Sequence, residues 1–278
     1  MKTRLEIVFN YQSFTKASVL WELCDFSNQL SKSEGLDFVR SGSTQNLVPL
    51  TNVLKHIDNS KNPERITIDH PEHKPEERIA IRYTDLHEDF GMGRLDIIGF
   101  EKLIRDRDNW LPSIIAHDSF VQCRILDYDY SDVQNLKELE LYELNGIDHS
   151  HLPKIDNGLP FPVNKIIVDT SSNPGSFSLK KGYIEAVGAE MWLGKLFFER
   201  LQVSKEDVLS CGFADVETLE SQVVHIKAFD KPFDSDKGEQ RENINTDPKQ
   251  GHHHHCAKET NWQAQHYPES QPEAQEQR

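Results

Sequence analysis

Two short alternating segments follow each other directly in the chain, at residues 65–69 and 78–83, and this pair constrains the fold most. RITID and RIAIRY both alternate apolar and polar residues, as half-buried strands do. The segment between them, HPEHKPEE, is rich in proline and charge and suits a hairpin loop. Strands joined this closely pair antiparallel, which argues against a purely parallel α/β sheet. We therefore expect an α+β fold, with a mixed or largely antiparallel sheet and helices packed on it.

The remaining elements are predicted from residue type and periodicity. β-branched and aromatic runs predict strands at residues 4–10, 36–40, 94–98, 120–128, 163–169 and 222–229. Helical spacing predicts helices that begin near Ser13 or Thr15, at Asn46, near residue 99 and at Ser204. Residues 131–145 are ambiguous, and one interpretation is a helix capped by Ser131. Bulky apolar side chains cover most of the circumference of a helix drawn through residues 189–201, so we expect it to be buried on more than one side.

The composition of the chain changes after about Phe233. Residues 235–278 contain no Leu, Val or Phe and are rich in Gln, Glu, Asn, Lys and Pro, so they cannot build a core. We expect one domain over residues 1–233, with subdomain boundaries near 110–118 or 146–162 as alternatives, and a disordered polar tail over 234–278.

The charge balance favours a protein partner. The chain has 31 basic and 46 acidic residues and a formal net charge of −15, without a cluster of Lys and Arg. Nucleic-acid binding needs such a cluster, so nucleic acid is not expected as a partner, whereas a protein with a basic surface is. No signal peptide or membrane span is evident, and the four cysteines are far apart. These features predict a cytoplasmic protein with reduced thiols.

An acidic run at residues 127–132 is the candidate partner-binding patch. It interleaves tyrosine with aspartate, in the order Asp127, Tyr128, Asp129, Tyr130, Ser131, Asp132. Tyrosine supplies contact area at low entropic cost, and carboxylates steer a basic partner. The alternative interpretation is an ordinary solvated end of the preceding strand.

Two groups of histidines form the candidate metal site. Asp69, His70 and His73 fall in the expected hairpin loop, and His149 and His151 form an H-x-H pair in a proline- and glycine-rich segment. Together they could bind a metal ion for hydrolysis if the fold brought them into contact. The alternative is that both groups are solvated loop residues. We expect no cofactor. The tract His252–His255 resembles part of an affinity tag and is left out of the fold argument.

Residues 168–198 resemble the C-terminal half of uncharacterised bacterial proteins encoded beside polymorphic toxins. The resemblance is carried by Asn173-Pro174-Gly175, Gly182-Tyr183 and Met191-Trp192-Leu193-Gly194. Proteins of that group are often acidic α+β immunity proteins. The resemblance brings no catalytic motif and no site residues.

Three functions remain open from the sequence. The first is an acidic binding module, of the immunity or inhibitor class, that neutralises a cognate toxin by covering its active site. The second is a metal-dependent hydrolase built on Asp69, His70, His73, His149 and His151. The third is a scaffold without a discrete site. The phosphate-binding loop, HExxH and GxSxG motifs are absent, which favours the binding module over an enzyme.

Overall fold

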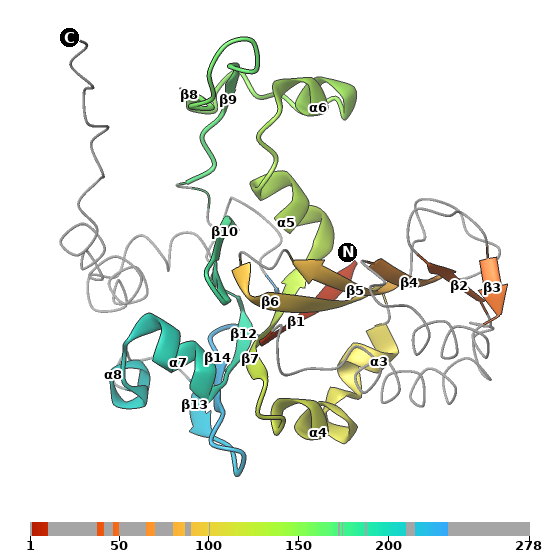
Figure 1. Ribbon diagram of the computed structural model, residues 1–278, viewed down its shortest axis with the longest axis vertical. Helices are drawn as coiled ribbons and strands as arrows, with labels where there is room; N and C mark the ends of the chain where they lie inside the picture. The colour runs from red at the N-terminus through yellow and green to blue at the C-terminus, as the bar shows by residue number, and fades with distance from the viewer. Residues whose placement is uncertain are drawn as a thin grey trace, which may run out of the picture.

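The chain folds around a large antiparallel sheet with helices on both faces (Figure 1). The structure is a computed structural model that describes residues 2–10, 38–41, 47–49, 65–69, 80–86, 90–99, 101–171, 173, 175–186, 188–209 and 215–232. The expected α+β class and antiparallel sheet are confirmed. The helix expected after Ser13 and the tail expected over 234–278 lie outside these residues. Within them, no helix has the length and apolar character needed to cross a bilayer.

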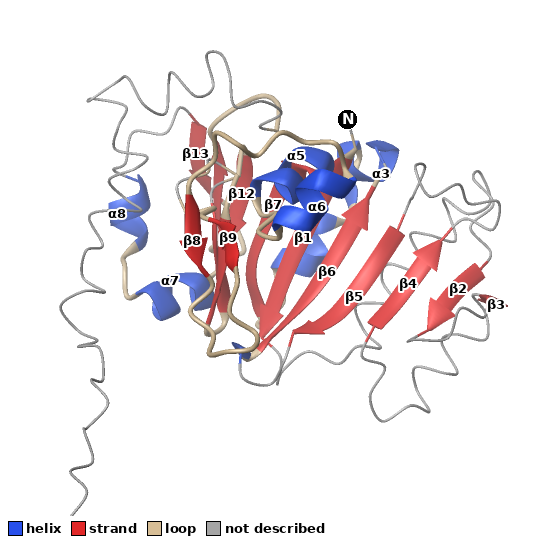
Figure 2. Ribbon diagram, turned by 90° about the horizontal axis from the view of Figure 1, so that it is seen from above, coloured by secondary structure: helices blue, strands red, loops and turns tan. Residues whose placement is uncertain are grey.

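The sheet has ten strands, and each pairing between neighbours is antiparallel (Figure 2). In spatial order they are β13 (Asp215–Thr218), β14 (Val224–Lys227), β12 (Glu190–Leu193), β7 (Phe120–Asp127), β1 (Thr3–Asn10), β6 (Met92–Ile98), β5 (Ala80–Leu86), β4 (Arg65–Asp69), β2 (Phe38–Ser41) and β3 (Leu47–Pro49). The predicted hairpin is present, since β4 pairs with β5. The N-terminal strand β1 lies in the middle, between β6 and β7, and is buried along almost all of its length.

One face of the sheet, which we call the first face, is apolar over the central strands β1 and β6 and is covered there by short helices. These are α3 (Glu101–Arg105), the 3-10 turn η3 (Arg107–Asn109) and α4 (Leu111–Ile115). Leu5 and Ile7 of β1 lie opposite Ile97 and Leu95 of β6, and side chains directly opposite each other share a face. Trp110 is buried between the helices, where its indole Nε1 donates to the Leu103 carbonyl at 3.0 Å. Burial of such large side chains stabilises the central strands.

The second face carries the helix α5 (Tyr128–Gln134), the hairpin β10 (Phe177–Lys180)–β11 (Tyr183–Ala186) and the helix α7 (Lys195–Leu201), followed by α8 (Lys205–Leu209). Its core contains Val8, Met92, Val121, Tyr183, Ile184, Met191, Leu193, Phe197, Phe198, Val224 and Ile226. The Gln122 side chain fixes the hairpin here. Its amide donates to the Ile184 carbonyl and accepts from the Ile184 N–H, both at 3.0 Å.

The helix predicted over residues 189–201 is wrong in its first half and confirmed in its second. Residues 190–193 form strand β12 between β7 and β14, and the helix begins only at Lys195. All four residues of β12 are buried because elements cover both faces of the sheet here. A strand covered on both sides is a continuous apolar run, which the periodicity of a short segment cannot distinguish from a buried helix. Gly194 marks the change, since a Cβ there would lie 2.8 Å from the Phe120 carbonyl oxygen.

Two further helix predictions are corrected. Residues 47–49, expected in a helix after Asn46, form strand β3, paired with β2 at the far edge of the sheet. Sheet pairing overrides the helical spacing of so short a segment. Residues 131–145 form two helices, α5 and α6 (Leu139–Leu144), and Ser131 is not a cap. The cap of α5 is Asp127, whose Oδ1 accepts from the Tyr130 N–H at 2.8 Å.

Candidate functional site

Charged side chains gather on the second face at the centre of the sheet. Glu6 of β1 lies directly opposite Asp96 of β6 and Arg124 of β7, and all three are buried. Arg124 Nε donates to Glu6 at 2.5 Å, while Arg4 Nη2 donates to Glu6 at 2.8 Å and to Asp96 at 2.7 Å. Arg94 lies 3.4 Å from Glu6 and 3.2 Å from Asp96. We call these five residues the charge cluster.

Within the charge cluster, the charged forms of Glu6 and Arg4 are stabilised by their neighbours. Burial alone would raise the pKa of Glu6, but Arg124, Arg4 and Arg94 lower it to about 2. Burial alone would likewise lower the pKa of Arg4, yet Asp96 and Glu6 raise it. A carboxylate this acidic neither donates nor takes up a proton near neutral pH. Glu6 therefore joins β1 to β7 and is not suited to acid–base catalysis.

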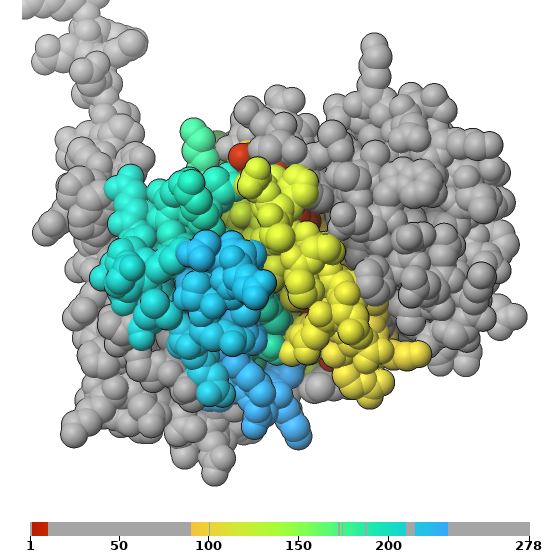
Figure 3. Space-filling model, turned by 90° about the horizontal axis from the view of Figure 1, so that it is seen from below, coloured from red at the N-terminus to blue at the C-terminus, as the bar shows by residue number. Residues whose placement is uncertain are grey.

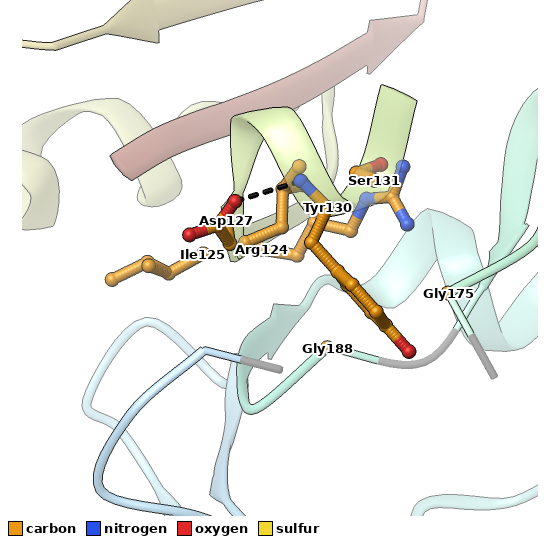
Figure 4. A pocket seen from close by; sticks show the side chains of 8 residues that line it. Arg124, Ile125, Asp127, Tyr130, Ser131, Gly175 and Gly188 are labelled. Atoms are coloured by element: carbon orange, nitrogen blue, oxygen red, sulfur yellow. Dashed lines mark hydrogen bonds between the residues drawn. The ribbon is translucent and has the colours of Figure 1, made fainter. Parts of the chain in front are cut away.

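A small pocket lies beside the charge cluster, under the first turn of α5 (Figure 4). It is lined by Arg124, Ile125, Leu126, Asp127, Tyr130, Ser131, Gly175 and Gly188. The Tyr130 ring extends from α5 toward the two glycines, and a Cβ on Gly175 would lie 3.1 Å from that ring. The space has room for a water-sized molecule and is too small for an organic substrate.

The predicted acidic patch is divided by the structure. Asp127 is buried as the cap of α5, and burial raises the pKa of its carboxyl. Tyr128 and Tyr130 are half-buried, whereas Asp129 and Asp132 are exposed on the helix. Asp127 therefore supports the helix from inside, and the two other aspartates remain accessible to a partner. Partner binding by this run stays a prediction.

Residues 136–169, which we call the arm, project away from the sheet above α5 (Figure 1). The arm comprises α6 and the strand pair β8 (Lys154–Asp156)–β9 (Ile166–Val168). Its base is closed where the Val168 N–H donates to the Lys137 carbonyl at 2.9 Å. Tyr142, only 1% exposed, donates its hydroxyl to the Leu136 carbonyl at 2.9 Å. Hydrogen bonds within the arm therefore hold its two ends together and fix Tyr142 in its interior.

The arm exposes large apolar side chains to an unusual degree. Among the described residues, the exposed large hydrophobic side chains all lie on the arm except Leu209, and they are Leu141, Leu144, Ile155, Leu159, Phe161, Val163 and Ile166. Phe161 is 87% and Leu144 81% exposed. The arm also has six acidic residues against three lysines. Single exposed apolar side chains are normal, whereas their concentration on one segment is a feature that interaction surfaces share.

Whether the two predicted metal-binding groups meet is not tested by the described residues. His149 packs against Tyr142 with ring centroids 5.6 Å apart, and His151 is an exposed residue 3.8 Å from Asp148. Both belong to the arm. His70 and His73 lie outside the described residues, and Asp69 is described only as the last residue of β4. No group of three potential metal ligands occurs among the described residues.

Comparison with protein-family models, with curated proteins and with solved structures gave no match. Membership of an immunity-protein family, inferred from residues 168–198, therefore stays a prediction. The resembling residues themselves are structural: Gly175 packs against α5, Gly182 adopts a φ of 89° in the turn of the β10–β11 hairpin, and Met191, Trp192 and Leu193 form β12.

Sequence reasoning missed both the charge cluster and the arm. Arg4, Glu6, Arg94, Asp96 and Arg124 occupy the polar positions of alternating strands, which is the pattern of a face open to water. For the arm, the sequence predicted a strand over residues 163–169, which contains β9, and left residues 131–145 ambiguous, with a helix as one interpretation. It gave no sign that the segment projects from the sheet with its large apolar side chains exposed.

Proposed function

We propose that this protein is an acidic protein-binding module that docks a partner through the arm. The observation that carries the proposal is the concentration of exposed apolar side chains on that one projecting segment. Such side chains form the centre of an interface when a partner removes them from water, and aromatic residues contribute most. Phe161, nearly fully exposed, is the anchor expected to enter a partner pocket.

The charge around these side chains defines the partner. The exposed residues Glu140, Glu143, Asp148 and Asp156 lie on the arm, and Asp129 and Asp132 lie on the adjoining helix α5. The partner surface that fits is therefore an apolar pocket with a basic rim. A toxin whose active site binds an anionic substrate has a surface of that kind, and covering it would inhibit the toxin. This supports the immunity or inhibitor class over a scaffold role.

Site-specific photo-crosslinking in the cells that make the protein tests the proposal. A crosslinking amino acid replaces Phe161 in one variant and Leu209, the exposed apolar residue outside the arm, in the matched control. We expect one protein to crosslink from position 161 and none from position 209. Equal labelling from both positions, or none from 161, would contradict the proposal.

The crosslinked protein is then purified and its affinity measured by calorimetry. Phe161→Ser and the charge reversals Glu140→Lys and Glu143→Lys should each weaken binding, Phe161→Ser by at least about tenfold, which corresponds to about 1.4 kcal/mol. Leu209→Ser and Glu199→Lys should leave the affinity unchanged. The affinity of Glu140→Lys and Glu143→Lys for the partner should also depend less on salt concentration than that of the native protein. Asp129→Lys and Asp132→Lys show whether the rim extends onto α5.

A further inference from the structure

A second cluster of charged and aromatic side chains lies on the first face, far from the arm and independent of it. It joins β12, β13 and β14 to the turn η3, along the line where the segments of α3–α4 and β13–β14 meet on the surface (Figure 3, yellow and blue). At its centre is His225 of β14. Trp192 lies directly opposite His225 on β12, and Glu217 lies opposite it on β13.

Both ring nitrogens of His225 face carboxylate oxygens. Nδ1 lies 2.8 Å from Glu217 Oε1, and Nε2 lies 3.0 Å from Glu190 Oε1. An ionised carboxylate only accepts hydrogen bonds, and a neutral imidazole has one N–H to donate. A neutral ring would therefore turn a lone pair toward one of the two carboxylates. The geometry fits the doubly protonated, positively charged ring.

The surroundings of His225 favour that charge. The imidazole stacks on the Trp192 indole at 4.7 Å between centroids and 11° between planes, an arrangement that attracts a cation. Two other cations lie nearby. Arg107 of η3 shares Glu190 Oε1 with His225, at 2.7 Å, and lies over the same Trp192 ring, 5.5 Å from its centroid. Lys227 of β14 contacts Asp230 at 3.0 Å. Asp215 of β13, opposite Lys227, adds a further negative charge.

The pKa shifts of His225 and Glu190 agree with this geometry. Burial alone would lower the pKa of His225, but its hydrogen bonds to Glu190 and Glu217 outweigh burial and raise the pKa above its ordinary value. Burial alone would raise the pKa of Glu190, yet the hydrogen bonds from His225 and Arg107 lower it. Both pKa shifts favour the charged forms of the pair, a carboxylate at Glu190 and an imidazolium at His225.

We propose that His225, as an imidazolium, is a pH-dependent clasp that holds the edge strand β13 on the sheet. In the described part of the sheet, β13 pairs with β14 alone, and Asp215, Glu217 and Thr218 of β13 are exposed. Four residue pairs and little apolar burial hold such a strand weakly, so one charge-assisted hydrogen bond is a large part of its attachment. Loss of the ring proton removes the positive charge that faces Glu217 and leaves one N–H for two carboxylates. The attachment of β13 is then weaker, and the backbone edge of β14 is uncovered more often.

The direction of the pH dependence follows from the raised pKa. Below the ordinary histidine value of about 6.5 the clasp is fully formed, and it weakens as the pH rises through the higher pKa of the folded protein. If Glu217 raises the pKa of His225 by one unit, the fraction of molecules with β13 released is about tenfold larger at high pH than at low pH.

Two measurements on the full chain test the proposal. Nuclear magnetic resonance of labelled histidine rings follows their titration, with exposed His151 as the internal reference. We expect His225 to titrate at higher pH than His151 and to carry protons on both nitrogens at about pH 6. Hydrogen exchange then reports amide protection in β13–β14 and, as reference, in β1–β7. Protection in β13–β14 should fall from about pH 6 to about pH 9, whereas protection in β1–β7 should not.

Glu217→Gln is the decisive variant because it keeps the shape of the side chain and removes its charge. It should lower the titration midpoint of His225 and remove most of the pH dependence of β13–β14 protection. Glu199→Gln, an exposed substitution on α7, should change neither. A midpoint for His225 at or below that of His151 would overturn the proposal, as would the same pH dependence in both strand pairs.

Discussion

Replacing Glu6 by Gln removes the central negative charge of the charge cluster and leaves its shape nearly unchanged. In the native protein the Glu6 carboxylate, 1% exposed, accepts from Arg4 and Arg124 and lies 3.4 Å from Arg94. Arg124 and Arg4 would then be buried cations short of a counter-charge. Breaking a buried ion pair in this way costs about 3–5 kcal/mol, so we expect Glu6→Gln to lower the free energy of unfolding by that amount at neutral pH.

The lowered pKa of Glu6 gives a second value for this loss of stability. The pKa of Glu6 falls from 4.5 to about 2 on folding. At about 1.36 kcal/mol per pKa unit, this fall corresponds to about 3 kcal/mol of folding stability. Because the folded-state pKa is the lower one, this stabilisation is complete above about pH 4.5 and is lost as the pH falls through about 2. The difference in stability between the native protein and Glu6→Gln should therefore shrink by about 2 kcal/mol between neutral pH and about pH 3.

Urea denaturation followed by tryptophan fluorescence measures this difference at each pH, since Trp110 and Trp192 are buried in the native state. Glu199→Gln is the matched control. The Glu199 side chain is 52% exposed and contacts Lys195 at 3.5 Å, so its loss should change stability by less than about 0.5 kcal/mol. A difference below about 1 kcal/mol for Glu6→Gln, or one that does not shrink in acid, would refute the account of the charge cluster.

Two further outcomes are expected. Asp127→Ala should destabilise the protein by about 1 kcal/mol in urea denaturation, because the Tyr130 N–H loses its capping acceptor, whereas Asp127→Asn keeps an acceptor and should cost less. The Cys123 thiol should resist a thiol reagent in the native protein and react fully in denaturant, since burial and the nearby Glu190 raise its pKa well above the ordinary value. Rapid labelling of native protein would contradict the buried position of β7.

Sequence reasoning located most strands because each had a local signal. β4 was expected at residues 65–69 and is found there, and the expected strands at 4–10 and 120–128 differ from β1 and β7 by one residue at one end. The capped helix after Ser204 is also present: Ser204 Oγ accepts from the Asp207 N–H at 3.1 Å, and Asp207 accepts from the Ser204 N–H at 2.9 Å. Such signals act within a few residues, so a single sequence shows them.

Features that depend on distant contacts were missed. The charged positions of β1, β6 and β7 are buried only because α5 and the β10–β11 hairpin cover them, and no local pattern shows that cover. The clasp at His225 likewise needs β12, β13 and η3, which come from three separate parts of the sequence. The exposure of the arm's apolar side chains, such as Phe161, likewise depends on how the segment projects from the body, which no local pattern shows.

The closed base of the arm allows its exposed surface to change separately from the fold. Residues 136–169 leave and rejoin the body at adjacent points, where Val168 donates to the Lys137 carbonyl. Under the proposed function, changes at Phe161, Leu144 or the surrounding carboxylates would alter what the arm recognises, and they would touch neither the sheet nor the charge cluster. A new binding preference can therefore arise by substitution, or by exchange of the entire segment, at little cost to stability, as with the variable loops of a binding scaffold.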